Sequence, residues 1–581
     1  MHLLDGLRCN TAVNYVCAHN EAAAAIMAEG YSRISENIGV LYVTTGPGGT
    51  NAVTGVVDAW IDSIPMLVLS GQAKRSQNVY NSGIPGLRQL GGQEVNILPI
   101  VDSFTKYSAM VNEPQLIKYH LDKAVYCAKH GRPGPSWLDI PLDVQATHVN
   151  EGDLVPFVAD QTKAPSINSK MFDKVCALLI EANRPLIIAG NGVRLSGSAR
   201  IFLQLVHAVK IPVVVSKLGL DLIGYEDPYF VGFGGTKGTR AANFAIQNAD
   251  LILSLGSRLA NPFIGYEHDL FARGAKKIIV DIDSRELKKF QFAVEVALEC
   301  DVHTFITELS ATVRQKSLPE RTDWIKTVTR WKNRYQTIHE NHEVNPEYVN
   351  LYSFFDSLYR VMDSNSIAIG DAGSVYYVIS QASRVKQGQR VIVPAGLGTM
   401  GLSLPLGIGA FYASKNATVI AVTGDGSLQM NIQELQTVFH NRIPLKVFVI
   451  SNGGYLTIKH TQEINFSGRF IGAGPDSGVS FPDLCDIAKA YKIPYASITV
   501  KEDLQKAIKE VINRNTAVLC EVFTDPNQKI IPSVTSTITE DGQMISMPLE
   551  DMAPFLERDE FFGEMIIEPI RNDKQDEHGV G

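Results

Sequence analysis

The sequence of 581 residues has few cysteines, no long apolar run and no dense block of basic residues. Its seven cysteines are scattered and never form a CxxC pair, which argues against a zinc cluster or a disulfide framework and favours the cytoplasm. No apolar stretch reaches the ~18 residues of a membrane span, and the N-terminus lacks the order of a signal peptide. With 61 acidic and 53 basic residues, the net charge is -8, so neither nucleic acid nor a membrane is an expected partner.

What the chain does contain is ordinary globular composition, with 45% hydrophobic residues, 47 glycines and 27 prolines. The length predicts several domains and is too great for a single core, and three α/β units of roughly 190 residues would account for it.

The first unit reads as a strand, a turn and a helix followed by a second strand. Residues 40–43 are apolar, residues 45–51 are rich in glycine, and residues 65–69 form another apolar run. The expected helix would place one face of Val53, Val56, Val57 and Trp60 against the sheet. This is a βαβ unit of a parallel sheet, with free backbone N–H groups at the start of its helix.

The middle of the chain predicts a second parallel sheet. A polar linker is expected over 151–170, and a charged surface helix over 317–347 leads to the third unit. Between them lie four apolar strands that end in Gly, Ser or Asp, where open α/β sheets bind ligands. These strands are residues 185–190, 211–215, 249–256 and 277–281.

The third unit repeats the arrangement of the first, with strands at 417–422 and 445–450 and a glycine turn at 423–427. Its helix would bury Ile432, Leu435, Val438 and Phe439. We therefore predict an α/β protein of three doubly wound parallel-sheet domains at 1–150, 165–315 and 345–540, then a C-terminal tail at 541–581. The polar residues 571–581 are expected to be mobile.

The most specific signal is Gly-Asp-Gly at 424–426, followed after twenty-five residues by Asn-Gly-Gly at 452–454. Mg²⁺ prefers oxygen ligands and often shares them with phosphates. Asp425, the Asn452 side chain and the Gly454 carbonyl can supply three such oxygens, while the turn offers N–H donors to a diphosphate. The alternative, a plain strand-turn-helix with a buried aspartate cap, is disfavoured by Asn452 at this spacing.

With this motif the sequence resembles the thiamine-diphosphate-dependent enzymes, in their acetolactate-synthase-like branch. The resemblance extends along nearly the whole chain. Its further motifs are His-Asn-Glu-Ala-Ala at 19–23, Ala-Glu-Gly-Tyr-Ser-Arg at 28–33, the turn at 46–51, Gly-Arg-Pro-Gly-Pro at 131–135, Gly-Leu-Gly-Thr-Met-Gly at 396–401 and the segment 424–434.

The resemblance implies roles for individual residues. Glu21 is similar to the glutamate that hydrogen-bonds the aminopyrimidine ring and promotes removal of the thiazolium C2 proton, for which a raised pKa is suitable. The Gly398 carbonyl would receive the 4'-amino group, Met400 would bend the cofactor, and Gln93 would join them as a catalytic residue. Asp425, Asn452 and Gly454 would bind Mg²⁺. The remaining thiamine diphosphate contacts implied are Pro47, Asn51, Gly373, Ser374, Gly424, Gly426, Ser427 and Tyr455.

The middle unit is similar to the FAD-binding domain of acetolactate synthases. The residues that carry this likeness are Gly190, Gly192, Gly238, Thr239, Gly256, Arg258, Asp281 and Asp301. Glycine turns and an arginine are also common in other nucleotide-binding α/β domains. FAD is therefore expected as a structural group, with an empty or ADP-binding domain as the alternative.

Several positions depart from the family pattern. Gly92 stands where a Phe is usual, Leu142 replaces a Lys, and Thr461 replaces the Trp that narrows the acceptor pocket. The diphosphate segment reads Gly-Ser-Val at 373–375, and Ser451 replaces the first Asn of a pair. The family's first strand and its Gly-Gly loop would precede residue 3, so either the chain is truncated or misassigned at its start, or the site lacks one wall.

The expected function is decarboxylation of a 2-ketoacid donor, pyruvate first, with transfer of the two-carbon carbanion to a carbonyl acceptor. The departures predict a wider pocket and a larger, less acidic acceptor, such as a nucleotide-linked keto-sugar. The family implies a homodimer or homotetramer whose subunits share each active centre. Alternatives are acetolactate synthase proper, a simple 2-ketoacid decarboxylase or oxidase, and a catalytically silent binding paralogue.

Overall fold

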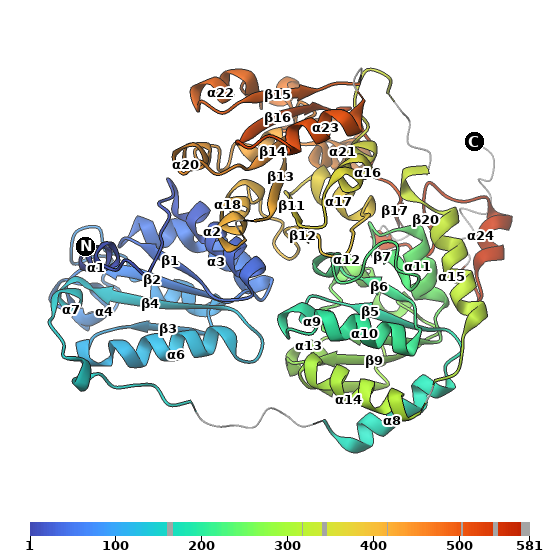
Figure 1. The fold of residues 1–581 in the computed structure, drawn as a ribbon, viewed down its shortest axis with the longest axis horizontal. Helices are drawn as coiled ribbons and strands as arrows, with labels where there is room; N and C mark the ends of the chain where they lie inside the picture. Colours follow the sequence, from blue (N-terminus) through green and yellow to red (C-terminus); the bar gives the residue numbers. More distant parts are fainter. Residues whose placement is uncertain are drawn as a thin grey trace.

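A computed structural model describes residues 1–159, 167–316, 318–339, 345–414, 416–500, 503–538 and 544–570 (Figure 1). Three parallel sheets follow one another along the chain, each with helices on both faces, which confirms the predicted fold class. Residues 571–581, which we expect to be mobile, lie outside the described residues, as does part of the predicted linker. Within the described residues, no helix has the length and apolar character needed to cross a membrane.

The first domain contains a four-stranded sheet of order β1-β2-β4-β3. Its strands are β1 (Gly39–Val43), β2 (Met66–Gln72), β3 (Tyr107–Met110) and β4 (Pro135–Pro141). Its helices are α1 (His2–Cys9), α2 (Glu21–Ser35), α3 (Pro47–Ile61), α4 (Val79–Ser82), α5 (Leu98–Val101), α6 (Ile117–Lys129) and α7 (Leu142–Ala146). The expected βαβ unit is present, because β1 and β2 pair in parallel with Gly39 opposite Met66.

The predicted apolar stripe of α3 is wrong in detail. Val56 is buried, but Val53, Val57 and Trp60 are only half-buried, and the buried face consists mainly of small residues. The reason is close packing against α2, because a Cβ on Gly55 would lie 2.6 Å from the Ala25 Cβ. Small side chains, and not bulky apolar ones, let these two helices approach.

The middle domain has a six-stranded sheet of order β10-β9-β8-β5-β6-β7. Its strands are β5 (Pro185–Ala189), β6 (Val213–Val215), β7 (Phe230–Phe233), β8 (Leu251–Leu255), β9 (Lys276–Asp281) and β10 (Val296–Glu299). Its helices are α8 (Ser169–Glu181), α9 (Gly192–Leu195), α10 (Ala199–Val209), α11 (Arg240–Asn248), α12 (Asn261–Ile264), α13 (Ser284–Lys288) and α14 (Val302–Gln315). All four predicted strands are present at their expected places.

The helix expected near 317–347 is α15 (Thr322–Arg334), and it is not purely a surface helix. It buries Trp324, Val328 and Trp331 against the middle domain. The described part of the tail covers it, because α24 (Arg558–Glu564) presents Glu564, whose carboxylate accepts a hydrogen bond from the Trp331 indole N–H at 2.7 Å. The short strands β17 (Ser533–Val534) and β20 (Met552–Ala553) pair antiparallel beside it, as do β18 (Ser536–Ile538) and β19 (Met544–Ser546).

The third domain has a six-stranded sheet of order β12-β11-β13-β14-β16-β15. Its strands are β11 (Ser366–Gly370), β12 (Arg390–Ile392), β13 (Thr418–Gly424), β14 (Lys446–Ser451), β15 (Tyr495–Ile498) and β16 (Val518–Phe523). Its helices are α16 (Leu351–Val361), α17 (Ser374–Gln381), α18 (Ser403–Ala413), α19 (Asp425–Leu428), α20 (Glu434–His440), α21 (Leu456–Phe466), α22 (Leu484–Ala490) and α23 (Leu504–Ile512). Of the predicted stripe, Leu435 and Val438 are buried, but Phe439 is 40% exposed.

The first and third domains meet where α2 crosses α18, the two helices seen side by side at the centre of Figure 1. A Cβ on Gly30 would lie 2.4 Å from the Leu406 carbonyl oxygen, and a Cβ on Gly409 would lie 2.0 Å from that of Met27. Both glycines are therefore needed for this contact, which fixes the position of one domain against the other.

Candidate cofactor site

Asp425 stands at the end of β13, and its carboxylate holds two predicted motifs together. One oxygen accepts a hydrogen bond from the Gly426 N–H at 2.8 Å, and the other accepts from Asn452 N at 3.1 Å and Gly453 N at 2.8 Å. Burial raises the pKa of Asp425 to about 6, and these N–H donors oppose that rise. A cation at this carboxylate would favour the ionised form.

The other two predicted metal ligands lie in the segment that follows β14. Within the described residues the Asn452 side chain has no hydrogen-bond partner, so its oxygen is available as a ligand. The same turn contacts the Gly-Asp-Gly segment, since a Cβ on Gly426 would lie 2.2 Å from the Tyr455 ring. One carboxylate, one amide oxygen and the Gly454 carbonyl form an oxygen donor set suited to Mg²⁺.

Open glycines surround this donor set. Gly373 precedes α17 with φ 76°, and neither it nor Gly424 or Gly453 would bring a Cβ within 4 Å of another atom. The N-terminus of α17, which starts at Ser374, favours an anion. Ser427 is buried in the short helix α19. This open, N–H-lined space fits a diphosphate bound through a divalent cation.

Gly398 and Met400 lie in a segment that Asp371 fixes at one end. Asp371 is buried and accepts hydrogen bonds from the backbone N–H of Gly401 at 2.9 Å and of Ser403 at 3.1 Å, and from Thr423 Oγ1 at 3.0 Å. Gly398 has φ 71° and nothing within 4 Å of its Cβ position, so its surroundings are open.

The first domain assembles a second group of predicted residues. Glu21 begins α2, and one of its carboxylate oxygens accepts a hydrogen bond from Asn51 Nδ2 at 3.1 Å. Pro47 starts α3 beside it, after the turn at Gly46. Gln93 reaches the same turn, because a Cβ on Gly46 would lie 2.0 Å from the Gln93 carbonyl oxygen.

No direct contact between these two groups is recorded among the described residues of one chain, where no hydrogen bond or ion pair joins the Glu21 group to the Asp425 group. Glu434, from the third domain, fixes the backbone that leads into Glu21. Its carboxylate accepts hydrogen bonds from His19 N at 3.0 Å and Asn20 N at 3.1 Å.

A cavity of about 490 Å³ lies where the middle domain faces the other two. Five of the residues predicted for FAD line it, namely Gly192, Gly256, Arg258, Asp281 and Asp301, whereas Gly190, Gly238 and Thr239 do not. Gly190 instead packs behind the lining, because a Cβ on Gly190 would lie 2.2 Å from the Gly256 carbonyl oxygen. Thr239 caps α11 through its side chain.

The cavity also contains two lysines that the sequence motifs did not reveal. Lys217 Nζ lies 3.1 Å from the centroid of the Tyr376 ring, and Lys237 Nζ lies 5.9 Å from that of Tyr377. Burial lowers the pKa of both, and neither has a carboxylate partner among the described residues. Burial disfavours the charged form of these two amines, and an anionic ligand with a planar ring system bound beside them would restore it.

The sequence motifs missed Asp371 and Lys217, and they contained Glu434 only as the last residue of the segment 424–434, without a role for it. These three residues act through contacts with other segments of the chain, and no local spacing marks those contacts. The only sequence signal was the position of Asp371 and Lys217 shortly after predicted or observed strands, where ligand sites of α/β sheets gather.

Comparisons with known proteins find relatives along nearly the whole chain. Models of the thiamine pyrophosphate enzymes match residues 1–97 (N-terminal TPP binding domain), 172–309 (central domain) and 371–522 (C-terminal TPP binding domain). The acetolactate synthase large subunit of Lactococcus lactis subsp. lactis is 31% identical over 94% of this chain and 92% of its own length. For acetolactate synthase isozymes 1 and 2 of Escherichia coli, identity is 29%, with 91% and 92% of this chain and 90% and 92% of theirs covered.

Proposed function

The chain belongs to the acetolactate-synthase-like thiamine pyrophosphate enzymes, and from this premise we propose that it decarboxylates a 2-ketoacid, pyruvate first, and joins the two-carbon unit to a carbonyl acceptor. Thiamine diphosphate supplies the carbanion-stabilising chemistry when bound. The observation that carries the proposal is the pair of hydrogen bonds that holds the backbone of Asn452 and Gly453 against the Asp425 carboxylate, with open glycines around it.

Each residue then has a task. Asp425, the Asn452 side chain and the Gly454 carbonyl bind Mg²⁺, while Gly373, Ser374, Gly424, Gly426 and Ser427 surround the diphosphate. Glu21, oriented by Asn51, shares a proton with the pyrimidine ring. The Gly398 carbonyl would accept a hydrogen bond from the amino group of the cofactor, and Met400 would support its rings. Pro47 and Gln93 would lie on the Glu21 side of the cofactor, and Tyr455 on the Asp425 side.

The test is product analysis with pyruvate as donor, with and without added acceptors. Glu21→Gln is expected to bind the cofactor with affinity within about threefold of the parent, yet lose activity by about 100-fold, because the amide cannot share the proton. Asn51→Asp is a matched control that perturbs the same contact by charge repulsion. An inactive parent, or an active Glu21→Gln variant, would favour a silent binding paralogue or another mechanism.

We also propose that the central cavity binds FAD as a structural group. Support comes from the volume of about 490 Å³, the glycine turns at its edge, the Arg258 guanidinium, and the amines of Lys217 and Lys237, which an anionic ligand would favour in their charged form. The purified protein should be yellow, and heat denaturation should release flavin into the supernatant. A protein that stays colourless after refolding with excess FAD, and binds ADP instead, would exclude this proposal.

The acceptor is proposed to be larger than a second pyruvate. Gly92 is exposed with an empty Cβ position, Leu142 starts α7 without offering a cation, and Thr461 lies exposed on α21. Gly92 and Thr461 therefore leave the proposed acceptor side without two aromatic side chains. Each such side chain would bury about 150–250 Å² of surface.

Basic groups near α21 favour phosphate on that acceptor. Burial lowers the pKa of His460, and Lys237, Lys459 and Lys529 lower it further, against the opposing charge of Glu463. We therefore retain a nucleotide-linked keto-sugar as the candidate acceptor. In competition for pyruvate it should outcompete 2-ketobutyrate and a second pyruvate. Efficient formation of acetolactate with no gain from the bulkier acceptor would instead identify acetolactate synthase proper.

A homodimer or homotetramer is proposed, in which a second copy completes each site, because no hydrogen bond or ion pair joins the Glu21 and Asp425 groups among the described residues of one chain. A cytoplasmic location is proposed because the seven cysteines form no disulfide among the described residues.

A further inference from the structure

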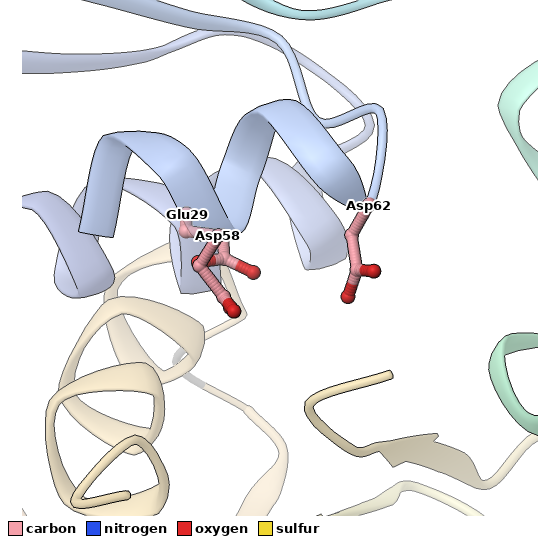
Figure 2. Close-up of side chains that lie close together, drawn as sticks. All are labelled: Glu29, Asp58 and Asp62. Carbon is pink, nitrogen blue, oxygen red and sulfur yellow. The ribbon is translucent and has the colours of Figure 1, made fainter. Parts of the chain in front are cut away.

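Three buried carboxylic acids lie together between α2 and α3. Figure 2 shows Glu29 and Asp58 side by side and Asp62 at the end of α3. Their carboxylate oxygens lie within 4.8 Å of one another, and none of the three residues is more than 2% exposed. The Arg33 guanidinium already fills the space between them, 2.6 Å from both Glu29 and Asp62. Because this cation is present, the cluster is an ion-pair network and not a metal site.

The cluster reaches across to the third domain. The Asp62 carboxylate accepts hydrogen bonds from the backbone N–H of Gly396 at 3.0 Å and of Ala395 at 3.3 Å, and Asp58 accepts one from Thr399 Oγ1 at 3.2 Å. The approach is close, since a Cβ on Gly396 would lie 2.0 Å from Ile61 Cγ2.

The segment held in this way contains Gly398 and Met400. Asp62, from the first domain, fixes its start, and Asp371, from the third domain, fixes its end through Gly401 N at 2.9 Å. Between these two anchors Gly398 is open on its Cβ side. The segment therefore spans two carboxylates that belong to different domains of one chain.

Two of the three acids in the cluster, Asp58 and Glu29, have a raised pKa. Burial beside Glu29 and Asp62 raises the pKa of Asp58 to about 9, so Asp58 is protonated at neutral pH. Burial also raises the pKa of Glu29, against the Arg33 charge that lowers it. Asp62 is paired with Arg33 and accepts two N–H groups, and such charge-assisted hydrogen bonds are the stronger kind.

We propose that Asp62 is a positioning residue, supported by Asp58, that holds segment 395–400 so that Gly398 and Met400 keep their places beside the pyrimidine ring. This inference rests on the proposed function, because it is the proposed cofactor that gives those two residues their roles. It adds a contact from the first domain of the same chain to the construction of the site.

The test compares Asp62→Asn with Asp58→Asn, the same chemical change one helical turn apart. Amide hydrogen exchange is measured without cofactor on the peptide 393–402. Asp62→Asn should accelerate its exchange by about tenfold or more, because a neutral amide oxygen accepts these N–H groups more weakly than a carboxylate does. Asp58→Asn should change it by less than about twofold, since an amide resembles the protonated acid. Exchange in β14 should stay unchanged in both variants.

Activity gives the second measurement. Asp62→Asn should lower kcat about tenfold while KM for pyruvate stays within about twofold, because positioning and not substrate binding is lost. Parental exchange in 393–402, equal acceleration in β14, or faster exchange with unchanged kcat would each overturn the proposal. The exchange result needs neither cofactor nor substrate, so it stands even if pyruvate proves not to be the donor.

Discussion

Asp425 carries the negative charge of the proposed metal site at a place where burial opposes ionisation. Replacing it with alanine removes the anionic ligand and leaves the diphosphate charge poorly neutralised. Asp425→Ala should therefore weaken binding of thiamine diphosphate in the presence of Mg²⁺ by about 100-fold or more. Calorimetry measures this change. Asp476→Ala, at an exposed acid of the same domain, is the control, and equal affinities for the two variants would remove Asp425 from the site.

Asp139 gives a second prediction at this scale, because burial raises its pKa from 3.8 to about 7. The folded protein then holds a proton that the unfolded chain has released, so the stabilisation is full below pH 3.8 and is lost as the pH rises towards 7. Hydrogen bonds from Ser70 at 2.6 Å and Gln72 at 2.8 Å oppose this shift only in part.

Asp139→Asn cannot ionise and should escape this loss. Between pH 5 and pH 7.5, the free energy of unfolding of the parent should fall relative to the variant by about 2–3 kcal/mol. Denaturant titrations at both pH values measure the difference. A constant difference between parent and variant across this range would mean that Asp139 titrates with an ordinary pKa.

Single residues also show how far the sequence could be interpreted. Asp425, Asn452 and Glu21 follow recognisable spacings, and the chemistry of oxygen ligands and shared protons points to them directly. Asp62 and Asp371 have no such spacing, because their partners are backbone N–H groups of a segment far along the chain. The contact of Asp62 depends on how two domains pack and that of Asp371 on how one domain folds, and no local pattern encodes either.

At the scale of elements, strands were predicted well and helix faces less well. Short apolar runs between Gly, Ser or Asp residues marked β5, β8, β9, β13 and β14 because buried parallel strands are apolar on both faces. The face of α3 was wrong because the rule favours bulky residues, whereas Gly55 packs against Ala25. Close helix contacts select small residues, and the 3.6-residue period alone does not reveal them.

Beside the central cavity, the turn that follows β8 packs against the first residue of α9, and this close contact supports a prediction about Gly256. Gly256 has φ 53°, and its Cβ would lie 2.6 Å from the Gly192 Cα, whereas Gly197 has φ 69° and open space around it. Both positions disfavour alanine by backbone conformation, but only Gly256 is also crowded.

Gly256→Ala should therefore destabilise the protein by about 2–4 kcal/mol and reduce flavin content, whereas Gly197→Ala should cost about 1 kcal/mol and leave flavin bound. Thermal unfolding and the absorbance of released flavin measure both effects. If the two variants behave alike, the close approach of α9 and β8 is not required for the cavity.

At the scale of the whole molecule, α2 and α3 connect two regions of the proposed site. Their N-terminal ends present Glu21 and Asn51, and their C-terminal ends hold segment 395–400 of the same chain through Arg33 and Asp62. In a homodimer with shared centres, each chain would therefore supply Glu21 to one centre and arrange Gly398 and Met400 in the other.

Mixing two inactive variants tests this arrangement. Glu21→Gln and Asp425→Ala chains, unfolded together and refolded, would form mixed dimers in which one centre carries both changes and the other carries neither. Random pairing makes half of the dimers mixed, so about a quarter of the parental activity should return. The control is each variant refolded alone, which should stay inactive. If mixing restores nothing although mixed dimers form, Glu21 and Asp425 of one chain serve the same centre, because every chain in the mixture would then carry a damaged one.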